Sequence, residues 1–82
     1  MSDPLKLETI TAFLAIDHDG NEGICAIGTV GLEGERLTPM VCADQRRVEQ
    51  MRPIARDIAR KTGTRIVVAV FSVRTDIEEI DP

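Results

Sequence analysis

Residues 44–63, DQRRVEQMRPIARDIARKTG, decide the fold because they carry the clearest helix signal in the chain. Asp44 is a favoured N-cap residue, Arg60 and Lys61 suit the last turn, and Gly63 is a typical helix terminator. The apolar residues fall within an arc of about 140°, the width expected for a helix laid on a sheet. They are Val48, Met51, Ile54, Ala55, Ile58 and Ala59. Pro53 predicts either a kink or a second helix that starts at that residue.

Four segments around this helix are rich in Ile, Val, Thr and Ala and are bounded by glycine or acidic turns, which is typical of strands. They are residues 9–17, 23–30, 36–43 and 65–74. The order β-β-β-α-β predicts one α+β domain over residues 1–82, with 1–8 and 75–82 as terminal segments. We expect a four-stranded, mostly antiparallel sheet with the helix packed on one face. A right-handed crossover predicts the strand order 3-2-1-4, with the fourth strand parallel to the first.

The turn between the first two strands reads DHDGNEG, residues 17–23, and offers oxygen ligands at alternate positions. A calcium loop needs Gly at position 6 and Glu at position 12. Counted from Asp17, these positions hold Glu22 and Gly28. Since Asp-Gly between two β-type runs is a strong hairpin signal, the stretch predicts a turn and no metal site.

Two-residue turns set the expected register of the hairpins. A turn at Asp19-Gly20 places Leu14 opposite Cys25, and a turn at Glu33-Gly34 places Cys25 opposite Cys42. Opposed Cβ atoms in an antiparallel pair lie farther apart than a disulfide prefers. We therefore expect two buried free thiols.

This register gives the sheet two apolar faces. One holds Ile10, Ala12, Leu14, Ile16, Cys25, Ile27, Met40 and Cys42, and the other holds Phe13, Ala15, Ile24, Ala26, Val30, Leu37 and Val41. One helix covers only one of them. The second face is left for residues 4–8, for the C-terminal tail or for another molecule, and a homodimer through the open face is our expectation.

Composition excludes several classes of protein. The 82 residues carry a net charge of −4, which argues against a nonspecific nucleic-acid binder. Basic residues gather in the helical stretch and its exposed arc holds Arg46, Arg52, Arg56 and Arg60, for which a solvated face is the simpler interpretation. No apolar run approaches the roughly 20 residues of a membrane span, and MSDPLKLET lacks the features of a signal peptide. The sequence predicts a cytoplasmic protein of a bacterial host cell.

Catalytic and metal-binding signals are equally sparse. Two cysteines and one histidine do not have zinc-site spacing, and the chain has no phosphate loop, nucleophile elbow or catalytic triad. With two Phe and no Tyr or Trp, little is available to line a ligand pocket. We expect no enzyme activity, no metal and no cofactor.

The succession FLAIDHDGNEGICAIG, DQRRVEQMRPIARDIARKTG and VVAVFSVRTDIEEI resembles small proteins of phages, prophages and gene-transfer agents. Within that group the chain is similar to anti-CRISPR proteins of type I systems, type I-C among them. The resemblance implies a non-enzymatic inhibitor that binds subunits of a CRISPR surveillance complex and blocks target DNA binding, with no direct nucleic-acid contact. The alternative is a small phage-derived homodimeric accessory or regulatory protein with a sheet-face interface.

A partner-binding surface follows from the expected topology. If the first and fourth strands are parallel, the turn after one and the tail after the other emerge at the same end of the sheet. This gathers six carboxylates, Asp17, Asp19, Glu22, Asp76, Glu78 and Glu79, into one acidic edge. Such an edge can steer the protein onto a Lys/Arg surface that normally receives phosphates. The simpler alternative is a solubilising rim, and the arginine face and open sheet face are the other candidate surfaces.

Overall fold

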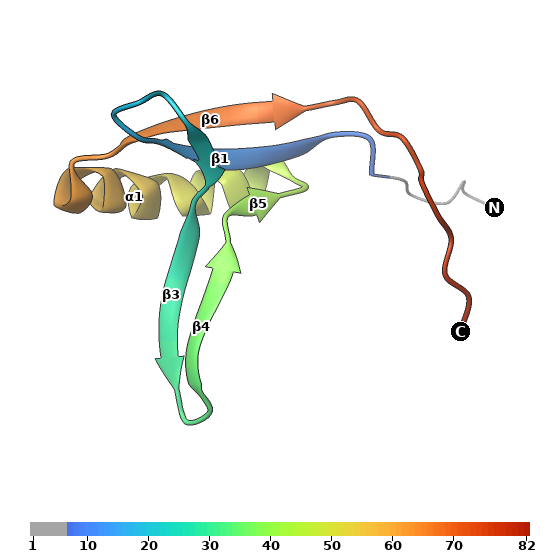
Figure 1. The fold of residues 1–82 in the computed structure, drawn as a ribbon, viewed down its shortest axis with the longest axis horizontal. Helices are drawn as coiled ribbons and strands as arrows, with labels where there is room; N and C mark the ends of the chain where they lie inside the picture. Colours follow the sequence, from blue (N-terminus) through green and yellow to red (C-terminus); the bar gives the residue numbers. More distant parts are fainter. Residues whose placement is uncertain (1–6) are drawn as a thin grey trace.

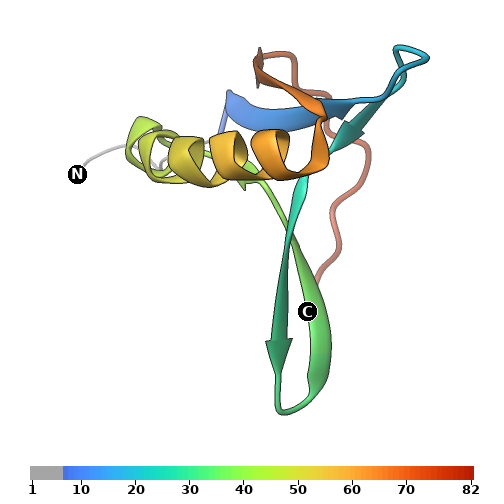
Figure 2. The same ribbon diagram turned by 90° about the vertical axis from the view of Figure 1, so that its left-hand side faces the viewer.

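The structure, a computed structural model, describes residues 7–82 and has an α+β fold. The elements run in the order β1 (Ile10–Ile16), β2 (Glu22–Ile24), β3 (Ala26–Gly31), β4 (Gly34–Pro39), β5 (Val41–Cys42), α1 (Gln45–Thr62) and β6 (Arg65–Phe71). β2, β1, β5 and β6 form one antiparallel sheet, and β3 and β4 form a second, two-stranded sheet. α1 lies across one face of the first sheet (Figures 1 and 2).

β1 is the centre of the larger sheet. β6 pairs with the whole length of one edge of β1, from Ile10 opposite Phe71 to Ile16 opposite Arg65. The other edge is shared: β2 pairs with residues 14–16 of β1, and β5 pairs with residues 11–12. All these pairs are antiparallel, so the predicted parallel fourth strand and the order 3-2-1-4 are wrong.

The antiparallel direction of β6 follows from the hairpin β3–β4, because this hairpin is inserted into what would otherwise be one strand, formed by β2 and β5. Cys25 N–H donates to the Phe13 carbonyl oxygen (2.8 Å), and Phe13 N–H donates to the Met40 carbonyl oxygen (3.0 Å). Met40 N–H in turn donates to the Cys25 carbonyl oxygen (2.8 Å), which closes the base of the hairpin. β2 and β5 therefore run in the same direction along β1. β5 enters α1 antiparallel to β1, whereas the third strand of a meander would run parallel to it.

The hairpin β3–β4, here called the arm, projects away from the larger sheet (Figure 1). Together with the C-terminal tail it makes the molecule extended, with a radius of gyration of 15.6 Å. A compact chain of this length has a radius of about 12 Å. Every residue of β4 is exposed, and so are Val30 and Leu32 on the rest of the arm.

Both predicted hairpin registers are wrong. Leu14 lies opposite Ile24, because residues 17–21 form a longer loop than the predicted two-residue turn. The arm pairs Ala26 with Pro39, and its turn centres on Leu32-Glu33. Cys25 consequently lies beside Met40 and not opposite Cys42. Since side chains alternate along a strand, the shift of one residue in β2 moves Ile24 to the face predicted for Cys25.

The core lies between α1 and the sheet. Its buried residues are Phe13, Cys25, Met40, Cys42, Val48 and Ala55, and Met51, Ile58, Ile66 and Ile27 pack against them. Cys25, Met40 and Cys42 thus share a face with Phe13, contrary to the predicted faces. Both thiols are buried and free, as predicted, and Cys42 Sγ lies 3.2 Å from Met51 Sδ.

The ends of α1 confirm the sequence signals. The Asp44 carboxylate accepts a hydrogen bond from Arg47 N–H (2.8 Å). Gly63 adopts the left-handed conformation, with φ of 69°, and its N–H donates to the Ala59 carbonyl oxygen (2.9 Å). The helix runs without interruption through Pro53, so the alternative of a second helix starting there is wrong.

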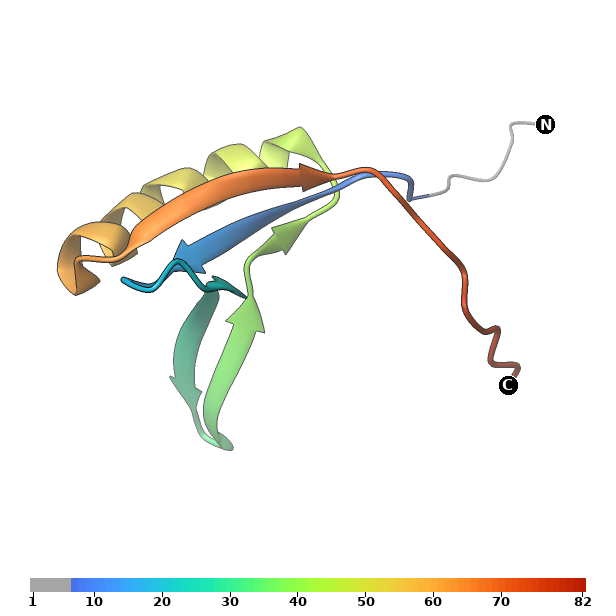
Figure 3. The ribbon, with the colours of Figure 1, turned by 45° about the horizontal axis from the view of Figure 1, so that its top comes forward.

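The sheet face opposite α1 is apolar and partly open among residues 7–82. Ile10, Val67 and Phe71 are 38–48% exposed on this face, and Ile24 of β2 is 57% exposed. The C-terminal tail does not cover it, because the tail leaves the end of β6 and runs away from the sheet (Figures 1 and 3). The predicted cover by residues 4–8 falls largely outside the described residues.

Candidate protein-binding surfaces

The loop between β1 and β2, residues 17–21, is a fixed turn. Its anchor is Asp17, whose carboxylate oxygen Oδ1 accepts hydrogen bonds from the N–H groups of Asp19 and Asn21, each at 2.9 Å. Asp17 N–H also donates to the Asn21 carbonyl oxygen, and Gly20 N–H donates to the Asp17 carbonyl oxygen, both at 3.0 Å. Gly20 has a φ of 86°, which favours glycine. The sequence signal for a turn is confirmed, and Asp17, Asp19 and Glu22 are all exposed on it.

These hydrogen bonds also act on the charge of Asp17. The hydrogen bond from Asn21 N–H is the largest influence on the Asp17 carboxylate and lowers its pKa. Desolvation opposes it and is the second-largest influence, but further hydrogen bonds from Asp19, the Asn21 side chain and Gly20 keep the pKa below the ordinary 3.8. The loop therefore presents an ionised carboxylate whose oxygens are already oriented by the backbone.

The other three predicted site residues lie at the opposite end of the sheet. β6 is antiparallel to β1, so residues 72–82, here called the tail, leave the sheet at the end where β1 begins (Figures 1 and 3). Asp76, Glu78 and Glu79 are thus separated from Asp17, Asp19 and Glu22 by the length of β1. The predicted single acidic edge is wrong in its geometry, and the structure has two acidic segments in its place.

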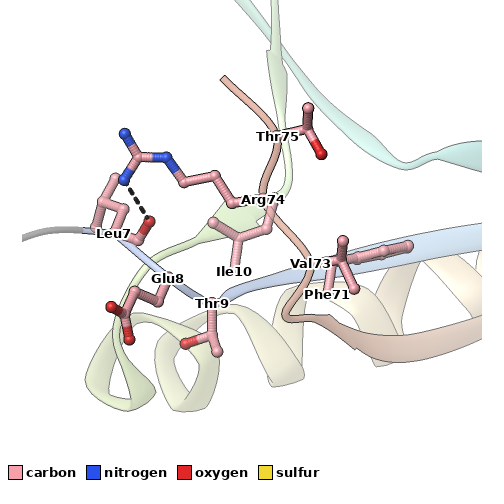
Figure 4. A pocket seen from close by; sticks show the side chains of 8 residues that line it. All are labelled: Leu7, Glu8, Thr9, Ile10, Phe71, Val73, Arg74 and Thr75. Carbon is pink, nitrogen blue, oxygen red and sulfur yellow. Dashed lines mark hydrogen bonds between the residues drawn. The ribbon is translucent and has the colours of Figure 1, made fainter. Parts of the chain in front are cut away.

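The start of the tail is tied to the segment before β1. Arg74 Nη1 donates to the Leu7 carbonyl oxygen (3.2 Å), and Arg74 Nε donates to Asp76 Oδ1 (2.7 Å). Around this contact is an open hollow of about 620 Å³, which Figure 4 shows between the two segments. Its apolar side chains are Leu7, Ile10, Phe71 and Val73. Farther along the tail, Ile77 and Ile80 are 92% and 86% exposed.

The outer edge of β6 has unpaired backbone groups. The N–H and C=O groups of Phe13 point toward Met40 and Cys25. Because these groups alternate along a strand, the N–H and C=O groups of the even-numbered residues of β1 point toward β6. In the register of the pair, Val67 lies opposite Leu14 and Ala69 opposite Ala12, so the backbone groups of Val67 and Ala69 form hydrogen bonds with β1. The N–H and C=O groups of Ile66, Val68 and Val70 point outward, away from β1. Among residues 7–82 no strand pairs with this edge.

A groove of about 220 Å³ runs between α1 and the same edge. Phe13, Ala55, Ala59, Ile66 and Val68 line it, together with Arg52 and Arg56. The Arg52 Nε atom is buried and lacks a hydrogen-bond partner within the described residues; Glu49 Oε1 lies 3.7 Å away. On the same helix Glu49 is ion-paired with Arg52, and Asp57 with Lys61.

Sequence reasoning missed this groove and the free edge of β6. The continuous apolar run at residues 66–71 is typical of a strand covered on both sides, whereas Val68, Val70 and Phe71 are 42–67% exposed. Arg52 was placed on the solvated arc, but it lies at the groove. The signal that could have found it is the i, i+4 spacing of Arg52 and Arg56 beside Ala55 and Ala59.

Across residues 7–82 no group of three or more His, Cys, Asp or Glu side chains is placed to hold a metal ion. The one helix in that range is too polar to cross a membrane. Comparison with models of known protein families, with curated proteins and with solved structures finds no match.

Proposed function

We propose that this protein is a non-enzymatic inhibitor of a type I CRISPR surveillance complex, and that it docks on complex subunits through the acidic loop between β1 and β2. The observation that supports the loop as the contact surface is its preorganised structure. Its backbone is fixed by four hydrogen bonds around Asp17, and three carboxylates are displayed at the tip. A fixed loop binds without the entropic cost of ordering a flexible one.

The chemistry of the target supports the same surface. A DNA-binding complex presents Lys and Arg side chains to phosphates, and a group of carboxylates on a small protein can occupy the same positions. Among residues 7–82, the loop has no basic side chain ion-paired to it other than His18, which lies 3.6 Å from Asp19. In the tail, by contrast, Asp76 is already paired with Arg74.

The test is target-DNA binding by a purified type I-C complex with increasing amounts of the protein. We expect inhibition by the wild type, and weaker inhibition by the variant Asp17→Asn/Asp19→Lys/Glu22→Lys, in which Asn retains an oxygen acceptor for the turn. The matched control, Glu33→Lys/Glu35→Lys, changes charge on the arm and should inhibit as the wild type does. Undiminished DNA binding at saturating wild-type protein contradicts the function, and full inhibition by the loop variant contradicts the assigned surface.

A homodimeric accessory or regulatory protein with a sheet-face interface is the second candidate. The observation that favours it is the partly exposed apolar face of β1 and β6, with Ile10, Val67 and Phe71. Charge substitution at Val67 should then abolish a wild-type dimer. A dimer that persists in Val67→Lys would contradict this candidate.

A further inference from the structure

We propose that the outer edge of β6 binds the tail of a second copy of this chain as an additional antiparallel strand, and that two copies exchange their tails reciprocally. The interface consists of β6, the groove residues Arg52 and Arg56, and residues 73–81 of the second copy. This inference does not rest on the proposed inhibition of a CRISPR complex.

The outer edge of β6 is unprotected among the described residues. Ile66, Val68 and Val70 offer outward N–H and C=O groups, and the strand between Ile66 and Phe71 has no proline, charge or bulge. Natural sheets usually protect such an edge with a charge, a proline or a covering segment. An edge without these features is suited to accept an extended chain.

The positive charge beside the edge of β6 indicates that an acidic segment binds there. Arg52 and Arg56 lie along the groove that borders β6. Pairing β6 directly with β6 of a second copy would bring the two arginine rims together, and like charges in an interface are strongly unfavourable. An acidic strand avoids this repulsion, and it supplies an acceptor for Arg52 Nε, which has none among the described residues.

The tail has the chemistry that this groove requires. It carries four carboxylates, at Asp76, Glu78, Glu79 and Asp81, and one basic residue, Arg74. Its apolar side chains Val73, Ile77 and Ile80 are 86–92% exposed in the single chain. Because side chains alternate along a strand, binding along β6 would place Ile80 on the groove side with Ile66 and Val68, and Val73 and Ile77 on the open sheet face with Val67 and Phe71.

The position of the tail makes the exchange symmetric. The tail follows β6 directly and runs on beyond the sheet (Figure 3), so two antiparallel copies that cross near Val73 place each tail beside the other β6. A regular continuation of β6 then sets Val68 opposite Glu78 and Ile66 opposite Ile80 of the second copy. The crossing point lies beside the apolar hollow of Figure 4, which Val73 helps to line. Because each copy gives one tail and receives one, this two-fold symmetric exchange stops at a dimer and does not lead to fibres.

The experiment measures the mass of the full chain by sedimentation equilibrium over a range of concentrations and salt. We expect a wild-type dimer that weakens as salt rises. The tail variant Glu78→Arg/Glu79→Arg and the groove variant Arg52→Glu/Arg56→Glu should each raise the dimer dissociation constant by about tenfold or more. Mixed in equal amounts, the two variants should restore dimers, since each tail then meets a groove of opposite charge.

Circular dichroism is used to test whether each variant keeps its helix. The control, Glu33→Arg/Glu35→Arg on the arm, changes the charge by the same amount as the tail variant and is expected to dimerise as the wild type does. A monomeric wild type overturns the proposal. So does a tail variant that dimerises normally, or a mixture of folded tail and groove variants that stays monomeric.

Discussion

Asp17 illustrates how one residue can serve both structure and surface charge. Its carboxylate organises the loop by accepting two backbone hydrogen bonds and adds a negative charge to the exposed tip. Asp17→Asn keeps an acceptor oxygen and removes the charge, whereas Asp17→Ala removes both. We expect the melting temperature to fall more for Asp17→Ala than for Asp17→Asn.

The pH dependence of this residue follows from its lowered pKa. A carboxyl group that is more acidic in the folded chain stabilises the fold above its ordinary pKa of 3.8, and this contribution is lost as the pH falls through the folded-state value. NMR titration of the Asp17 side chain should give a pKa below 3.8. A value at or above 3.8 would show that the loop hydrogen bonds do not form in solution.

Single residues were predictable where the signal is local. Asp44 and Gly63 mark the ends of α1 because their chemistry acts on neighbouring backbone groups, and the structure places both where expected. Cys25 and Met40 gave no such signal. They look like ordinary strand residues, and their role at the base of the arm depends on bonds to Phe13, which is distant in the sequence.

Pro53, in the interior of α1, allows a direct test of the helix. α1 continues through this position, so Pro53 leaves the Glu49 carbonyl oxygen without the usual N–H donor. Proline in a helix interior costs about 3 kcal/mol relative to alanine. We therefore expect Pro53→Ala to raise the free energy of unfolding in urea titrations, with Gln50→Ala as a control on the same helix. A clear loss of stability would mean that Pro53 begins a separate helix in solution.

The helix and the strand segments could be predicted from periodicity and β-branched composition, but their pairing could not. The predicted strands at 23–30 and 36–43 are each divided, because the two legs of the hairpin leave β1 at Cys25 and return at Met40. Nothing in the local sequence distinguishes this insertion from a plain meander. The direction of β5, and with it that of β6, depends on this insertion. The predicted fourth strand was therefore assigned the wrong direction.

Antiparallel pairing of β1 and β6 divides the predicted acidic site into two segments at opposite ends of the molecule. The exposed carboxylates could be named from the sequence, since turns and tails are exposed in most folds. Their grouping could not, because it depended on strand direction. The two segments are now given different roles in our proposals: the loop contacts a foreign protein, and the tail contacts a second copy.

The measurement that tests this division most directly is residue-resolved amide hydrogen exchange in β6, comparing the wild type at high concentration with Glu78→Arg/Glu79→Arg. The N–H groups of Val67 and Ala69 bond to β1 and should be protected in both proteins. The outward N–H groups of Ile66, Val68 and Val70 should be protected in the wild type and exchange rapidly in the variant. Rapid exchange of these three amides in both proteins, or equal protection in both, would contradict the account.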